Sequence, residues 1–363
     1  MTSSQVSSQE VVRTFHPGWY GAVMGTAIVG VAAALNPGGA AALQPVMGAV
    51  GVAFVGLAAL LAVALGVPYV VRWFRYSQTA LNDLRHPVLG ALYATFPGGL
   101  LVLAAAIAAV GPLALSPRIV FPLVVVLGAV GAALAFVVSV AFTYVLFMSP
   151  EIRAEHVNGG WFIPPVINII VPLVLVAWMP QVGPDAVKLL AMGSYATWGI
   201  GFFLFLLVAS LLYGRLVYHP LPAAPLAPSL WIGLGPIGVG SLALLRVAQG
   251  SAALWGEQSR LVVSLSAAAA LALWGFGWWW LAMAAVLLYR YRRRGGLPYG
   301  VGWWAFTFPL GAFTVSTLAL SRFWQAPLLE GAGVLLFALL LAFWGVVALR
   351  SLEAVRSGAA WRR

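Results

Sequence analysis

Ten long apolar stretches dominate the sequence, and each is long enough to cross a lipid bilayer as a helix. A transmembrane helix needs about 20 mainly apolar residues to cross ~30 Å of hydrocarbon. Short polar connections separate the stretches, which cover residues 17–36, 46–70, 88–111, 119–147, 160–179, 186–214, 228–248, 260–289, 301–321 and 327–349. We therefore predict an all-α polytopic membrane protein with ten spans, numbered in chain order.

Charged residues are scarce, which supports this assignment. Only 7% of the 363 residues are charged, against about 25% in soluble domains. There is no cysteine, which excludes disulfides and thiolate metal sites. We divide the chain into a cytoplasmic N-terminal tail (1–16), a ten-helix transmembrane domain (17–350) and a basic cytoplasmic C-terminal tail (351–363). No cleavable signal precedes span 1, so we expect this span to direct its own insertion.

The basic residues are divided unequally between the two sides of the predicted membrane domain. Both termini and the connections that follow even-numbered spans share one side, which holds fourteen of the nineteen Lys and Arg residues. The other side holds five, namely Arg118, Lys188, Arg246, Arg260 and Arg322. The positive-inside rule predicts that both termini are cytoplasmic. The net charge of +11 follows from this topology, so it requires no nucleic-acid partner, and the basic tails suit anionic membrane lipids.

A weak repeat introduces each odd-numbered span. The segments are "HPGWYGAVMG" at His16, "HPVLGALYATFPGG" at His86, "HVNGGWFIPP" at His156, "HPLPAAPLAPSLWIGLGPIG" at His219 and "LPYGVGWWAFTFPLG" at Leu297, and they start 63 to 78 residues apart. Two spans fill each period, so we predict five consecutive helical hairpins.

Helix-breaking residues are concentrated in the odd-numbered spans. Spans 3, 5, 7 and 9 contain Pro97, Pro164, Pro165, Pro172, Pro236 and Pro309, and span 1 contains Gly21, Gly25 and Gly30, whereas even-numbered spans keep Pro68 and Pro122 to their ends. A proline inside a helix frees the carbonyl four residues earlier, which is Ala305 for Pro309. Such a carbonyl costs several kcal/mol in lipid unless protein or water satisfies it. We therefore expect an inner ring of odd spans around a pore and an outer layer of even spans.

The predicted interior has neutral polar residues but no acids. All eight acids lie near or beyond span ends, which argues against a proton relay or a metal-dependent membrane enzyme. The neutral polar residues of the odd spans are Thr26, Thr95, Asn168, Thr307, Thr314, Ser316 and Thr317. They suit an anion that has lost part of its hydration, or they bond to carbonyls of their own helices. We expect no cofactor and no enzymatic activity.

Four histidines precede the cytoplasmic starts of successive odd spans, at His16, His86, His156 and His219. Because a five-hairpin ring would spread them around its rim, we favour loop capping over a shared metal site. The alternative is a cytoplasmic pH sensor, since histidine titrates near neutrality. Arg85, near the same rim, would raise the local concentration of anions.

These motifs resemble the tellurite-resistance/dicarboxylate transporter family, which includes bacterial tellurite-resistance proteins, sulfite efflux pumps, malate permeases and plant slow anion channels. The matching segments are "FHPGWYGAVMGTAI" at Phe15, "LRHPVLGALYATFP" at Leu84, "GGWFIPPVINIIV" at Gly159, "APSLWIGLGPIGVG" at Ala227 and "WWAFTFPLGAFTVSTLAL" at Trp303. The resemblance implies five hairpins with quasi-fivefold symmetry around a central pore, and a homotrimer with one pore per subunit.

A phenylalanine plugs the pore in that family, and the matching residue is Phe308. We expect Pro309 to bend span 9 so that the ring of Phe308 crosses the pore, with Phe96 before Pro97 as a second constriction. The residues predicted to line the pore are Gly25, Thr26, Thr95, Pro97, Asn168, Gly235, Pro236, Thr307 and Pro309.

The sequence thus predicts a gated channel or transporter for small anions in the cytoplasmic membrane. The candidate anions are sulfite, chloride, nitrate, other oxyanions and C4-dicarboxylates. The alternative is a proton-coupled C4-dicarboxylate (malate) permease, in which the rim histidines or the substrate itself would carry protons.

Overall fold

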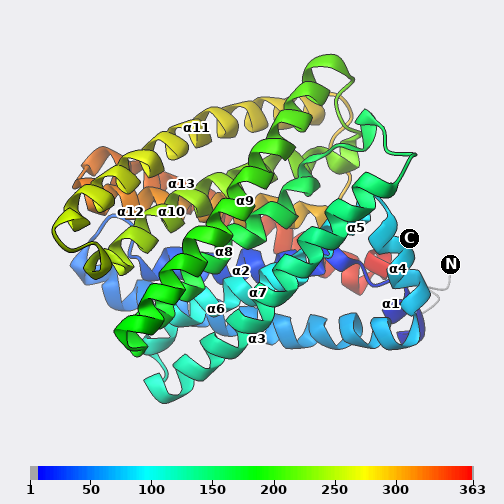
Figure 1. Cartoon of the computed structure of the whole chain (residues 1–363). Coiled ribbons are helices and arrows are strands. Elements are labelled where there is room, and N and C mark those ends of the chain that lie inside the picture. The colour runs from blue at the N-terminus through cyan, green and yellow to red at the C-terminus, as the bar shows by residue number, and fades with distance from the viewer. Residues whose placement is uncertain (1–6, 362–363) are drawn as a thin grey trace.

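The computed structural model describes residues 7–361, and within this range ten helices are long and apolar enough to cross a membrane. They are α2 (Tyr20–Ala34), α3 (Gln44–Arg75), α6 (Thr95–Val110), α7 (Pro117–Met148), α8 (Ile163–Trp178), α9 (Pro184–Tyr218), α10 (Leu234–Gly250), α11 (Ser259–Arg293), α12 (Phe308–Trp324) and α13 (Pro327–Arg356). In this order they correspond to predicted spans 1 to 10, so the ten-span prediction is confirmed. Figure 1 shows them running roughly along one common direction.

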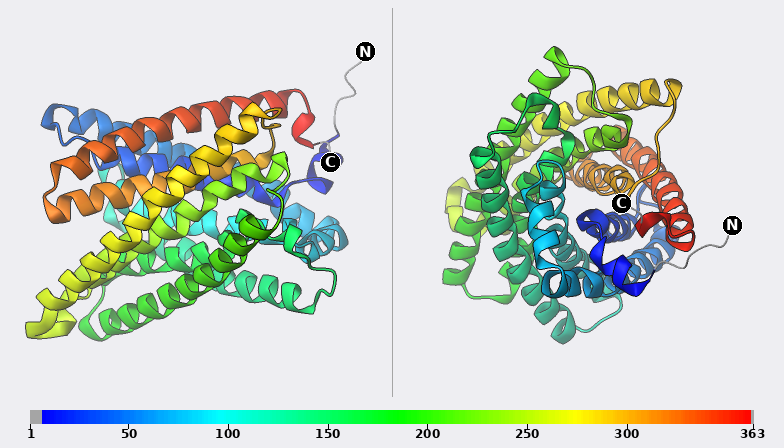
Figure 2. Two further views of the ribbon diagram at one scale, coloured as in Figure 1. Left: turned by 90° about the horizontal axis from the view of Figure 1, so that it is seen from above. Right: turned by 90° about the vertical axis from the view of Figure 1, so that its right-hand side faces the viewer.

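The odd-numbered spans form an inner ring. Helix α2 packs against α6, α6 against α8, α8 against α10 and α10 against α12, and α12 returns to α2. Figure 2 shows this ring from the end where both termini lie. The most apolar windows of the odd spans are 61–94% buried, whereas those of the even spans are only 17–28% buried. The expected division into inner and outer helices is therefore confirmed, and quasi-fivefold symmetry stays a prediction.

Each inner α-helix is preceded by a short helical segment, and the two together form one span. These segments are η1 (Pro17–Trp19), α5 (Leu89–Leu92), η5 (Gly159–Phe162), η7 (Ala224–Gly233) and η9 (Val301–Phe306), of which all but α5 are 3₁₀ helices. Most prolines of the odd spans lie just after this junction, in the first turn of the α-helix, while Pro172 lies inside α8.

Pro309 does not interrupt a continuous α-helix. Pro309 is the second residue of α12, where a proline costs no intrahelical hydrogen bond and its fixed φ suits the helix. Span 9 instead changes from a 3₁₀ helix to an α-helix at Phe308. The outer helices also differ from expectation, because α3 and α7 extend far enough to place Pro68 and Pro122 in their interiors.

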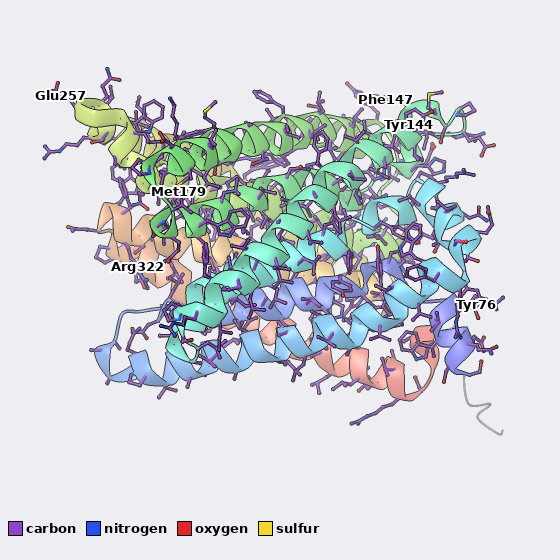
Figure 3. The ribbon with its side chains drawn as sticks, turned by 60° about the horizontal axis from the view of Figure 1, so that its bottom comes forward. Tyr76, Tyr144, Phe147, Met179, Glu257 and Arg322 are labelled. Carbon is purple, nitrogen blue, oxygen red and sulfur yellow. The ribbon has the colours of Figure 1, made fainter. Side chains whose placement is uncertain are left out.

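The two ends of the molecule are distinguished by the chain termini. Figure 3 labels Tyr76, Tyr144 and Phe147 at the end near the termini, and Met179, Glu257 and Arg322 at the opposite end. We call these the terminal end and the far end. The remaining short helices are η2 (Ala41–Leu43), η3 (Gly111–Leu113), η6 (Met179–Gln181) and η8 (Ala252–Gln258) at the far end, and α1 (Ser8–Arg13), α4 (Ser77–Arg85), η4 (Ala154–His156) and η10 (Ala359–Trp361) at the terminal end.

The segments predicted to be tails are packed within the described range. Buried Arg72 of α3 donates hydrogen bonds to the Arg13 carbonyl (3.2 Å) and the Tyr93 hydroxyl (2.9 Å), and it pairs with Asp83 at 2.6 Å. At the other chain end, α13 continues to Arg356 and the ring of Trp361 stacks on Phe15. Residues on both sides of the predicted transmembrane domain (17–350) therefore pack against the rest of the molecule.

Candidate functional site

A cavity of about 440 Å³ opens at the terminal end, and we call it the terminal cavity. All five short segments that precede the inner α-helices, or the residues beside them, contribute to its lining. One residue from each is His16, Leu92, Asn158, Ser229 and Trp304. Ala354, Ala359 and Ala360 from the C-terminal part of the chain line the same cavity, so this part lies beside its mouth.

A second cavity of about 270 Å³ lies among the inner helices toward the far end of the molecule, and we call it the far cavity. It is lined by the α-helical parts of all five inner spans, for example by Val31, Ala105, Leu173, Leu242 and Val315. Sixteen of its seventeen lining residues are apolar and the remaining one is Arg246.

Among residues 7–361, Phe308 is the one residue that lines both cavities. It is the first residue of α12 and is 6% exposed. A β-carbon added at Gly235 of α10 would lie 3.7 Å from the edge of its ring, which leaves room beside the ring for a small group. We call the two cavities, together with the Phe308 ring that borders both, the passage.

Thr95 and Pro309 are the predicted pore-lining residues that line this passage, both in the terminal cavity. The hydroxyl of Thr95 lies 2.7 Å from the carbonyl oxygens of both Pro17 and Leu92. Because a hydroxyl has one proton, it donates to one of these carbonyls at a time. Thr95 thus links spans 1 and 3 at the wall of the cavity.

Three of the polar residues predicted to line the pore are bonded to other protein groups and line neither cavity. Thr26 accepts a hydrogen bond from the Trp344 indole of outer helix α13 at 3.1 Å. The Asn168 amide donates to the Ser139 hydroxyl of outer helix α7 at 2.6 Å, and the Thr307 hydroxyl donates to the Trp304 carbonyl at 2.8 Å. These residues lie outside both cavities because buried polar groups need partners, which outer helices supply for Thr26 and Asn168 and which its own span supplies for Thr307.

The remaining predicted glycines and prolines act in packing. A β-carbon added at Gly25 would lie 2.0 Å from the Thr307 hydroxyl oxygen, so this glycine allows α2 and span 9 to approach closely. Pro97 and Pro236 are buried in the first turns of α6 and α10 and line neither cavity. Gly235 also lies outside both linings, beside the ring of Phe308.

The second constriction expected at Phe96 is not part of the passage. Its ring stacks on Tyr69 of outer helix α3, with centroids 4.4 Å apart and planes within 5°. Its other contact is an edge-on one with Tyr20, at 4.7 Å between centroids. Offset and edge-on aromatic pairs are favourable, so Phe96 fills the space between inner and outer helices.

The histidines mainly cap loops. Nδ1 accepts a hydrogen bond from a backbone N–H in three cases: His16 from Gly18, His86 from Val88 and His156 from Arg153, each at 3.1 Å. His219 lies 3.8 Å from Glu155. Of the four and Arg85, only His16 lines the terminal cavity. Within the described range no group of three or more His, Cys, Asp or Glu residues could hold a metal ion.

Two residues of the passage escaped the sequence analysis. The charge distribution assigns Arg246 only to topology, although it follows Val239 and Leu242 at helical spacing on the face of α10 that lines the far cavity. Tyr299 lines the terminal cavity and donates to the Ser351 hydroxyl at 2.8 Å. Burial raises the pKa of Tyr299, so this phenol stays neutral at physiological pH.

Ten helices that are long and apolar enough to cross a membrane, with two cavities lined by the inner five, are typical of multi-pass channels and transporters. Residues 14–352 match the model of the voltage-dependent anion channel family, SLAC1, and the chain belongs to this family. This is the family that the sequence motifs indicated.

Two uncharacterized transporters of Methanocaldococcus jannaschii are similar to the chain over nearly its full length. One is 34% identical, covering 97% of this chain and 96% of the relative, and the other is 31% identical, covering 96% and 97%. A sulfite efflux pump of Trichophyton rubrum is 24% identical, covering 93% of this chain and 89% of the pump. The family and these relatives are described as channels, transporters or pumps rather than enzymes.

Proposed function

We propose that the protein is a gated conduit that lets small anions cross the cytoplasmic membrane down their electrochemical gradient. The observation that carries the proposal is the position of Phe308 between two cavities that are each lined by all five inner spans. In this proposal the ring of Phe308 closes the passage, and its displacement opens it.

The electrostatics of the passage favour anions over cations. No Asp or Glu of residues 7–361 lines either cavity. The N-termini of the inner α-helices lie close to the terminal cavity, since Thr95, Ile163 and Phe308 are the first residues of α6, α8 and α12 and all three line it. Each helix N-terminus carries a partial charge of about +0.5, which attracts anions in a region of low dielectric constant.

The apolar surroundings of Phe308 suit a gate that works by excluding water. Hydrophobic constrictions can close a pore by dewetting. Ala312 and Val315 on the same helix continue the apolar lining into the far cavity. An anion would therefore meet its main barrier at this ring.

Sulfite is the substrate that we propose to test first, because named relatives are sulfite efflux pumps. Chloride, nitrate, other oxyanions and C4-dicarboxylates are the other candidates. The fourteen basic residues at the terminal side support cytoplasmic termini. We also propose that the protein assembles as a homotrimer with one passage per subunit, following the family resemblance.

The decisive experiment measures current across planar bilayers that contain the purified protein, with chloride, nitrate, sulfite and malate gradients in turn. The conduit predicts currents that reverse at the anion equilibrium potentials. The alternative, a proton-coupled malate permease, predicts silent bilayers and proteoliposomes that accumulate malate only under a proton gradient. Equal malate uptake with and without the proton gradient would exclude that alternative.

A further inference from the structure

Arg246 gives the far cavity one fixed charge within an otherwise apolar lining. It lies on α10, one turn from the C-terminal end of this helix, and its side chain is exposed. The other sixteen lining residues have no polar group in their side chains. The distribution of basic residues between the two sides of the membrane therefore does not explain why this cation lines the far cavity.

Arg246 has no counter-ion among residues 7–361. The ion pairs in this range join Arg72 to Asp83, His219 to Glu155, and Arg350 to Glu353, and none of the hydrogen bonds involves Arg246. The charged neighbour that acts on it is Arg322, which is also a cation. A guanidinium keeps its charge in proteins and offers five N–H donors, so these donors face the cavity and solvent.

The far end also has an electrostatic disadvantage for anions. The five inner α-helices end there, and each helix C-terminus carries a partial charge of about −0.5. Arg322 offsets part of this charge by donating a hydrogen bond to the carbonyl of Leu35, the residue that follows α2. Arg246 faces the cavity itself, where it compensates the remaining negative potential on the path of an anion.

We propose that Arg246 is the anion-binding residue of the far cavity, where a small inorganic oxyanion pauses between the ring of Phe308 and the far mouth. The planar guanidinium matches two oxygens of such an anion in a bidentate contact. A cavity of about 270 Å³ has room for such an anion together with some of its water. This inference rests on the proposed function, because it concerns the same passage.

The test compares nitrate currents of wild type, Arg246→Gln, Arg246→Lys and Arg260→Gln in planar bilayers, with nitrate added at the far side. Arg260 is the matched control because it is an exposed arginine at the same end that lines neither cavity. Arg246→Gln should raise the half-saturating nitrate concentration about tenfold, since a charged hydrogen bond contributes at least this factor. Arg260→Gln should leave it unchanged.

Arg246→Lys separates the charge from the shape of the group. It keeps the charge but loses the planar fork, so the half-saturating concentration should rise less than in Arg246→Gln, while the preference for nitrate over chloride should fall. Identical saturation in Arg246→Gln and Arg260→Gln, with a normal wild-type anion current, would overturn the inference and leave the conduit intact. Absence of anion current in wild type would instead remove the proposed function and this site together.

Discussion

Replacing Phe308 by alanine removes the side chain that separates the two cavities. The ring borders cavities of about 440 and 270 Å³, so under the proposed function its loss should join them into one open path. No other residue within 7–361 lines both cavities and could take its place. Phe308→Ala is therefore the single substitution that tests the gate most directly.

The size of the effect follows from how rarely the ring moves aside. Minor conformers that lie a few kcal/mol above the main one are populated at roughly 0.1–10%. If ion flow needs such a conformer at 1–10%, Phe308→Ala should raise conductance about tenfold to a hundredfold. The stability cost should be about 2–3 kcal/mol, below the usual 3–5 kcal/mol for Phe→Ala in a core, because the ring already borders two cavities.

The assay is macroscopic current per reconstituted protein, with thermal unfolding in detergent as the measure of folding. Phe313→Ala is the matched control, since Phe313 lies on the same helix, is fully buried and packs on Trp274 and Trp278 without lining either cavity. It should lower stability and leave conductance unchanged. A folded Phe308→Ala protein with wild-type current would refute the gate, and a similar increase in Phe313→Ala would show that loosened packing is the cause.

Three further substitutions test the surroundings of the passage. Gly235→Ala should fold normally and lower anion current, because the new methyl group would lie about 3.7 Å from the Phe308 ring and occupy space into which the ring could turn; an increased current would contradict this. Arg72→Met should cost about 3–5 kcal/mol by breaking the ion pair between buried Arg72 and half-buried Asp83 together with the other hydrogen bonds of the guanidinium, and calorimetry should show a smaller loss when Asp83→Asn is added. Gly25→Ala should cost about 1–3 kcal/mol through overpacking against Thr307, and Thr307→Ala should recover part of this loss.

The sequence predicted the features of the fold that depend on one physical requirement. Apolar length alone predicted the ten spans, and the uneven distribution of proline, together with the glycines of span 1, predicted which five would be buried. Both rest on the cost of unsatisfied backbone groups in lipid, which applies whatever the side chains pack against. Phe308 was identified because its motif matched a family, rather than from its chemistry.

The sequence was less informative about which face of an inner helix meets the passage. Thr26, Asn168 and Thr307 were placed in the pore because they are polar residues in apolar spans. Trp344 and Ser139, the partners of Thr26 and Asn168, are neighbours in space that a one-dimensional pattern does not reveal. Thr307 instead bonds to the Trp304 carbonyl three residues earlier, as the alternative of bonding within its own helix predicts. Arg246 shows the converse error, since an arginine near a span end was assigned to topology although its helical position aligned it with the lining residues.

The closed ring of hairpins also affects where the chain could be opened and its present ends linked. Linear arrays of helical repeats expose an unpaired face at each end and need special capping repeats. In this chain the first and last inner helices pack together, and the hydroxyl of Thr14 donates a hydrogen bond to the Trp361 carbonyl at 3.0 Å. No hairpin occupies an edge, so none has to act as a cap. Because each inner helix packs against two others of the ring, the connections at the terminal end are natural sites for circular permutation.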